Sequence, residues 1–229
     1  MRTATHNLSV AGVIAAKDLR AELRGRQAVT STLFLAAVTM LIFGFALGPD
    51  EDRLAVAGPG LLWLAIILSG ILAVGRLHHL ETDDGAFELL GLYPISRTGI
   101  YLGKALGGLA AMLVIGALVL PLTVILFAVD VASAVPGLLL VIALGSIGFA
   151  AVGTLYAGLT VRLRAREVLL PLLLLPVVAP LLLAAVSATA LLLAGDPFGE
   201  LPAWLQLLAG YDLAMLLAGG LTYGLALEE

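Results

Sequence analysis

Residues 161–180 read "VRLRAREVLLPLLLLPVVAP", and this stretch decides the fold class. Three arginines and a glutamate run directly into an apolar segment that carries Pro171, Pro176 and Pro180. In the helix of a soluble core, each proline would remove a backbone donor and clash with the turn before it. In a bundle of membrane helices, neighbouring helices, hydroxyl groups or water can satisfy the carbonyls that proline frees. The stretch therefore predicts the inner end of a bent transmembrane helix.

The composition of the whole chain indicates that its solvent is lipid. Of the 229 residues, 61% are apolar and 12% are charged, and the mean hydropathy is +1.11. Globular domains carry about 25% charged residues, so a soluble domain could not cover this much apolar surface. The absence of cysteine excludes disulfides, zinc–thiolate sites, iron–sulfur clusters and covalent haem attachment. The net charge of -4 and the dispersed basic residues give no footprint for nucleic acid.

Six apolar segments are close to or above the length of about 20 residues that a helix needs to cross a bilayer. They are Val29–Leu47, Leu54–Gly75, Ile100–Val129, Ala134–Val161, Val168–Ala194 and Leu201–Leu227. An alternating strand pattern, which a membrane barrel would need, is absent. The sequence predicts an all-α integral membrane protein with a six-helix permease domain over residues 29–229. Residues 1–28 precede it and do not read as a signal peptide, because no apolar stretch there ends in a cleavage site.

The basic residues predict the orientation of the chain. Eleven of the twelve lie before the first span or in the connections after the second and fourth spans, and only Arg53 lies on the other side. The positive-inside rule then places both termini in the cytoplasm. The opposite connections carry acidic residues, and Trp63 and Trp204 are expected near the outer headgroups. The acidic residues are Asp50, Glu51, Asp52, Asp130, Asp196 and Glu200.

The segment Val10–Arg26 is predicted to form a basic amphipathic helix along the inner face of the membrane. Its apolar side would comprise Leu8, Val10, Val13, Ile14 and Leu19, and its basic side Lys17, Arg20, Arg24 and Arg26. Glycines and alanines in the spans predict close contact between helices. They are Gly103, Gly107, Gly145, Gly148, Gly153, Ala157, Gly220 and Gly224.

The cytoplasmic connection Arg76–Lys104 is predicted to contain a second amphipathic helix. Phe87, Leu90 and Tyr93 recur at helical spacing, the acidic residues lie on the other side, and Pro94 ends the pattern. This helix could rest on lipid headgroups or place its apolar side in the groove of a protein partner. Anionic lipid disfavours the acidic side, which consists of Glu81, Asp84 and Glu88, and this favours the protein partner.

Two features within the spans allow more than one interpretation. Pro171, Pro176 and Pro180 could form a kink that improves packing, or a hinge or re-entrant turn such as transporters use along their path. Asp212 lies eight residues beyond Trp204, which is roughly 12 Å along a helix. A carboxylate at that depth costs about 2.5–3.5 kcal/mol and would face a cavity or partner. Alternatively, Trp204–Ala209 is a separate interfacial helix and Asp212 caps a short final span.

Four stretches together resemble the haem exporter protein B family, the membrane subunit of the cytochrome c maturation ABC transporter. They are "KDLRAELRGR" at 17–26, "GLLWLAIILSGILAVGR" at 60–76, "LETDDGAFELLGLYPISRTGIYLGK" at 80–104 and "RAREVLLPLLLLPVVAP" at 164–180. Their order and the six spans resemble that family over nearly the whole chain. The resemblance implies an ABC exporter (ABC-2-like) permease fold in the bacterial inner membrane, with the connection at 76–104 as the coupling loop for an ATPase.

The resemblance also implies partners and contact residues. The partners would be a cytosolic ATPase subunit (CcmA-type), CcmC- and CcmD-type membrane subunits, a CcmE-type periplasmic haem chaperone and a second copy of this chain. ATP would bind the ATPase subunit, and haem would be a substrate of the complex, with no cofactor bound by this chain. The implied ATPase contacts are Glu81, Asp84, Gly85, Phe87, Glu88, Leu90 and Pro94. The implied motif and hinge positions are Arg164, Arg166, Glu167, Pro171 and Pro176.

The residues themselves do not predict an enzyme. The segment "GIYLGK" at Gly99–Lys104 is one residue short of a phosphate-binding loop, and alanine follows the lysine where serine or threonine is needed. The adjacent histidines His78 and His79 would point about 100° apart on a helix, so they could not easily share a ligand. Three functions remain open: the permease subunit for cytochrome c maturation, a related exporter permease for a lipid or drug, and a non-transporting membrane scaffold.

Overall fold

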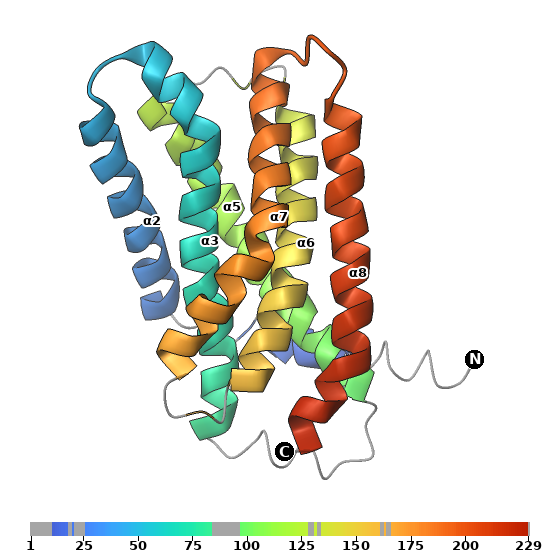
Figure 1. The fold of residues 1–229 in the computed structure, drawn as a ribbon. Helices are drawn as coiled ribbons and strands as arrows, with labels where there is room; N and C mark the ends of the chain where they lie inside the picture. The colour runs from blue at the N-terminus through green and yellow to red at the C-terminus, as the bar shows by residue number, and fades with distance from the viewer. Residues whose placement is uncertain are drawn as a thin grey trace.

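A computed structural model describes residues 11–17, 20, 26–83, 97–127, 131, 134–160, 163 and 166–228, and every long element in these ranges is a helix. Residues 11–17 are also helical. Figure 1 shows the long helices side by side in one bundle. They are α2 (Arg26–Leu47), α3 (Glu51–Asp83), α5 (Arg97–Phe127), α6 (Val135–Thr160), α7 (Arg166–Ala194) and α8 (Leu201–Glu228).

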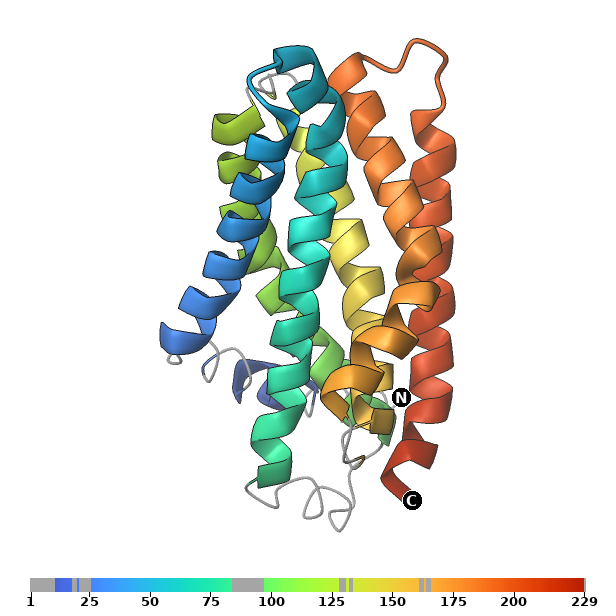
Figure 2. The ribbon, with the colours of Figure 1, turned by 60° about the vertical axis from the view of Figure 1, so that its left-hand side comes forward.

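The helices alternate in direction along the bundle, so the connections divide between its two ends (Figures 1 and 2). One end, called here the acidic end, carries the turns around Asp50 and Asp196. The other, called the basic end, carries the last turns of α3, the first turns of α5 and α7, the helix at 11–17 and the end of α8. Both ends of the described chain therefore lie at the same end of the bundle, as six crossings require.

The prediction of six membrane spans is confirmed, and the chain is a multi-pass membrane protein. Six described helices are long and apolar enough to cross a bilayer. Their spans are Thr30–Leu47, Asp52–Leu77, Arg97–Phe127, Val135–Thr160, Val168–Ala194 and Leu201–Tyr223. They agree with the predicted spans to within four residues at each boundary.

The bundle is built around α3 and α6. In an 18-residue apolar stretch of each helix, 61% of the residues of α3 and 67% of those of α6 are buried, against 17% in α2 and 11% in α8 at the edges. Glycines allow the close approach, because a methyl group at Gly145 would overlap the ring of Trp63, and one at Gly70 would overlap Met112. A methyl group at Gly153 would lie 3.3 Å from Val74 Cγ1. The predicted close packing at Gly145, Gly148 and Gly153 is therefore confirmed.

The prediction that Trp63 lies at the outer headgroups is wrong. Trp63 is 1% exposed, and its Nε1–H donates a 2.9 Å hydrogen bond to Thr189 Oγ1 on α7. The glycine at 145 on α6 leaves the space that the indole ring fills. The ring is held in the interior because its one polar group has a partner there, which a buried tryptophan usually requires.

The helix α7 continues through its three prolines from Arg166 to Ala194, so a re-entrant turn is not formed. It changes direction along its length, and its first half leans towards α3 (Figures 1 and 2). In that half, Leu170 Cδ2 lies 3.5 Å from the position that a Cβ of Gly75 would occupy. Proline-induced bending is the expected cause of the change in direction, and it brings the first turns of α7 onto α3.

The helix at 11–17 is attached to the bundle by part of its predicted apolar side. Ala11 and Ile14 are buried, and a Cβ at Gly103 of α5 would lie 2.8 Å from Ile14 Cβ. Val13 is 71% exposed, so it does not pack on the bundle, and its predicted place on the membrane-facing side of this helix stays a prediction. Leu8, Val10, Leu19, Arg24 and the side chain of Arg26 lie outside the described residues.

Candidate functional site

The predicted coupling residues lie mostly outside the described part of the chain. Residues 84–96, which include Asp84, Gly85, Phe87, Glu88, Leu90 and Pro94, are not described. Glu81 belongs to the last turn of α3, and its side chain is not described. The structure does show what holds the two ends of this segment, because α3 extends to Asp83 and α5 begins at Arg97. The predicted connection Arg76–Lys104 is thus helical at both ends.

The last turns of α3 are fastened to α2 by Arg76. Its Nη1 donates to Ser31 Oγ at 2.8 Å, and its Nη2 donates to Thr32 Oγ1 at 2.6 Å. Ser69 Oγ also donates to the carbonyl of Thr32 at 3.2 Å. A guanidinium group that makes several directed bonds fixes geometry better than a single contact. The α3 end of the connection is therefore held in place by the neighbouring helix.

The first turns of α5 are buried between α3, α6 and α8. Lys104 is 1% exposed, and its Nζ donates to the carbonyl of Leu77 on α3 at 3.4 Å. Tyr101 is 0% exposed, and its hydroxyl lies 3.1 Å from the carbonyl of Ala151 and 3.3 Å from that of Met215. The ring of Tyr223 on α8 packs on that of Tyr101, with 5.5 Å between their centroids. The α5 end of the connection is thus fixed to three helices.

Sequence reasoning did not single out Tyr101 and Lys104 as structural residues. Both belong to "GIYLGK", the segment compared above with a phosphate-binding loop. In the structure Gly99–Lys104 lies in the first two turns of α5 and the amine of Lys104 is buried, so the segment does not form such a loop. The available signal was a lysine and a tyrosine three residues apart in an otherwise apolar run, which predicts buried polar groups with partners.

The predicted motif and hinge positions lie at the start of α7. Arg166 and Glu167 are its first two residues, but their side chains are not described, and Arg164 lies outside the described part. Pro171 is half-buried and Pro176 is exposed. Tyr211 on α8 donates from its hydroxyl to the carbonyl of Val177 at 2.8 Å, directly beyond Pro176. The structure therefore links the proline-containing half of α7 to α3 on one side and to α8 on the other.

Asp212 lies inside the bundle near the middle of the apolar span Leu201–Tyr223. It follows Leu201, where α8 begins, by eleven residues, which is roughly 16 Å along the helix. Its side chain is 5% exposed, and neither carboxyl oxygen has a hydrogen-bond partner among the described residues. The alternative of a separate interfacial helix at Trp204–Ala209 is wrong, since α8 is continuous. The carboxyl group faces Gly148 on α6, where a methyl group would overlap Asp212 Oδ1.

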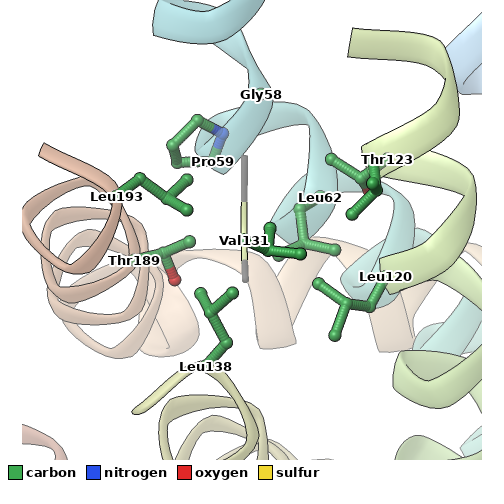
Figure 3. Close-up of a pocket in the computed structure, with 10 residues that line it drawn as sticks. Gly58, Pro59, Leu62, Leu120, Thr123, Val131, Leu138, Thr189 and Leu193 are labelled. Atoms are coloured by element: carbon green, nitrogen blue, oxygen red, sulfur yellow. The ribbon is translucent and has the colours of Figure 1, made fainter. Parts of the chain in front are cut away.

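A small apolar pocket lies near the acidic end between α3, α5, α6 and α7 (Figure 3). Its two hydroxyl groups already donate within their own helices, Thr123 to Val119 at 2.9 Å and Thr189 to Ala185 at 2.7 Å. The pocket therefore suits an apolar group and offers no ligand for a metal. The other residues that line it are Gly58, Pro59, Leu62, Leu120, Val124, Val131, Leu138 and Leu193.

Comparisons with known proteins identify similar sequences over most of the chain. The family model described as CcmB protein matches residues 10–229. Heme exporter protein B of Pseudomonas aeruginosa is 30% identical over 212 residues, which are 90% of this chain and 92% of that protein. Heme exporter protein B of Rhodobacter capsulatus is 35% identical over 169 residues, 72% of this chain and 75% of that protein. The protein of the same name from Paracoccus denitrificans is 34% identical over 169 residues, again 72% and 75%.

Proposed function

This chain belongs to the CcmB family, and on that premise we propose that it is the permease subunit of an ABC transporter complex for c-type cytochrome biogenesis. The observation that carries the proposal is the match over residues 10–229, which includes the connection at 84–96 as well as all six spans. The named relatives are called heme exporter protein B. We propose that haem is also the substrate of the complex in which this chain takes part.

ATP hydrolysis in this proposal belongs to a separate CcmA-type subunit. The stretch of this chain most like a phosphate-binding loop is helical and ends in the buried Lys104. Backbone amides within a helix are engaged in its own hydrogen bonds, so they cannot cradle phosphates as a loop does. The chain would bind ATP and haem only through the other members of the complex.

We propose that the ATPase binds the connection between α3 and α5. Phe87 and Leu90 would enter a groove on the ATPase, and Glu81, Asp84 and Glu88 would meet basic groups around it. Gly85 and Pro94 would set the two ends of the short helix. The fixed frame made by Arg76, Tyr101 and Lys104 supports this role, because a segment that transmits force must be held firmly where it enters the bundle.

Movement of the connection would reach the membrane part through helices that touch its frame. The first half of α7 packs on α3 at Gly75 and is linked to α8 through Tyr211 and Val177. In the proposal, Arg164, Arg166 and Glu167 join α7 to the inner connections, and Pro171 and Pro176 let its first half change angle. An ABC-2-like permease of this kind works as a two-fold pair, so a second copy of the chain is expected beside it.

The remaining parts of the proposal concern location and partners. The chain would lie in the inner membrane with both termini in the cytoplasm, because the basic end carries Arg76, Arg97 and Lys104. Its membrane partners would be CcmC- and CcmD-type subunits, and the complex would deliver haem to a CcmE-type chaperone in the periplasm.

The proposal is tested by deleting the gene and restoring it with a tagged copy of this chain. Expected results are loss of holo-cytochrome c in the deletion, recovery with the tagged copy, and co-purification of an ABC ATPase with that copy. Normal holo-cytochrome c in the deletion, or a tagged and active chain that captures no ATPase, would contradict it. As a further test, an ATPase variant that cannot hydrolyse ATP should still co-purify with the tagged chain but should not restore holo-cytochrome c.

A further inference from the structure

The side chain of Asp212 is enclosed by α6, α7 and α8 near the middle of the apolar span of α8. Its carboxyl group meets Gly148 of α6 at the point where Leu181 of α7 and the ring of Tyr211 also converge, since a Cβ at Gly148 would lie 2.7 Å from Leu181 Cδ1 and 3.1 Å from Tyr211 Cδ1. With 5% of the side chain exposed and no hydrogen bond of good geometry to either oxygen among the described residues, the group is largely shielded from solvent, and the backbone of Gly148 is the polar group beside it.

No cation on the surrounding helices is placed to balance a negative charge there. The helix α6 contains no charged residue from Val135 to Thr160, and α7 has only Arg166 and Glu167, at its first turn. The only other charged residue of α8 is Glu228, at its end. The helix α5, which also packs on α8, carries Arg97 and Lys104 within its first eight residues. All of these groups belong to the basic end of the bundle.

The other titratable groups around α8 are tyrosines with roles of their own. Tyr211 donates to the carbonyl of Val177, and Tyr101 bonds to carbonyls of α6 and α8. Tyr223 packs its ring on Tyr101, and Tyr156 of α6 is half-buried. None of these provides a positive charge. A carboxylate that is buried without a counter-ion or hydrogen bonds is strongly disfavoured in an apolar medium, and the protonated acid is the form that such a site accepts.

We propose that Asp212 is a proton-binding site within the membrane. The carboxyl group holds its proton while α8 is packed on α6 and α7, and it gives the proton to water when α8 separates from them. One side of α8 faces away from the bundle, since only 11% of the 18-residue apolar stretch within its span is buried, so the contact that must open is confined to the face that packs on α6 and α7. Gly148 is the structural counterpart, because its missing side chain makes the space for the carboxyl group. The inference concerns α8 alone and does not depend on the ATPase or on haem.

The proposal predicts that the packing of α8 depends on pH. The packed form holds a proton that the carboxyl group releases in water, so stability should fall as the pH rises. Asp212→Asn replaces the acid by a neutral group of the same shape. The stability of this variant should match that of the wild type at acidic pH, and it should no longer fall with rising pH through the titration of Asp212. Asp52→Asn is the matched control, since Asp52 is exposed at the acidic end.

The direct test is infrared spectroscopy of the full chain reconstituted in lipid nanodiscs at neutral pH. The wild type should show the carbonyl stretch of a protonated carboxyl group, this band should shift when aspartate is labelled with carbon-13, and it should vanish in Asp212→Asn but persist in Asp52→Asn. If the Asn variant does not fold, Asp212→Glu serves instead, because its band would no longer shift with labelled aspartate. A wild-type spectrum without the band, or a band that survives Asp212→Asn, would overturn the proposal.

Discussion

Trp63 on α3 and Thr189 on α7 are joined by a 2.9 Å hydrogen bond from the indole nitrogen to the threonine hydroxyl. The same hydroxyl donates to the carbonyl of Ala185 at 2.7 Å, so both of its functions are used. The indole ring lies against Gly145 of α6. Three helices therefore meet at one buried point without any charge, and their contact there is a fit between a large ring and a missing side chain.

This junction predicts a specific pattern of stability. Gly145→Ala should destabilise the protein by about 1–3 kcal/mol, because the new methyl group overlaps the ring of Trp63. Trp63→Phe should cost about 0.5–1.5 kcal/mol through the lost hydrogen bond, before any cavity effect. The free energy of unfolding in detergent micelles is the measurement. Gly60→Ala is the control, since nothing lies within 4 Å of a Cβ at that position. Equal stability of the two alanine variants would contradict the predicted contact.

The spans could be predicted from the sequence because their signal is local. Six apolar segments of sufficient length are recognisable without knowing how they pack, and the boundaries agree to within four residues. The direction in which one side chain points within a bundle is not determined by the local sequence. Trp63 was predicted at the headgroups because tryptophan is common there, yet its position is set by Gly145 and Thr189, which are distant in sequence.

Asp212 is a second example of a position that local sequence could not fully predict. Its depth could be predicted by counting residues, but whether α8 was one helix or two depended on packing against α6. The continuous helix from Leu201 to Glu228 places the carboxyl group opposite Gly148. The predicted glycine contacts of α6 and the predicted Asp212 site are therefore two halves of one arrangement, which a single sequence read along the chain does not reveal.

Topology is the next prediction. A reporter that is active only in the cytoplasm should work when it is fused after Glu229 or between His79 and Arg97, and it should fail after Asp130 or Asp196. The physical reason is that eleven of the twelve basic residues belong to one side of the predicted bundle. Reporter activity at Asp196 would be incompatible with the proposed orientation.

We expect two copies of the chain to pair through α2. This helix is an edge of the bundle (Figures 1 and 2) and exposes Phe34, Ile42 and Phe45, which are 69%, 60% and 81% exposed. Trp63, which was expected to share the interface, is buried within one copy. The chain has no cysteine, so a single cysteine at Phe45 gives a clean test by crosslinking within the ATPase complex. Crosslinked pairs should form there but not with a cysteine at Leu221 on α8, and absence of pairs at every tested α2 position would contradict the arrangement.

Pro171→Ala tests the bend in α7. Restoring a backbone donor should straighten the first half of the helix and weaken its contact with α3 at Gly75. We expect the ATPase to bind normally while the yield of holo-cytochrome c falls, because the connection is intact but its movement is no longer passed on. Val168→Ala, an exposed position in the same part of α7, is the control and should leave both quantities unchanged. A full yield of holo-cytochrome c in Pro171→Ala would show that Pro171 is not needed as a hinge.

The central claim is that an ATPase grips the connection between α3 and α5, and the Phe87→Ala/Leu90→Ala double variant tests it most directly. The loss of two apolar anchors should remove about 2–4 kcal/mol of burial, which weakens docking by roughly one to three decades. The amount of ATPase that co-purifies and the yield of holo-cytochrome c are measured side by side with a Val56→Ala/Leu221→Ala control, in which both side chains are exposed on the membrane spans. The account predicts that both quantities fall in the connection variant, at a normal level of inserted chain, and that neither falls in the control. Full ATPase binding and full cytochrome yield in the connection variant would contradict it.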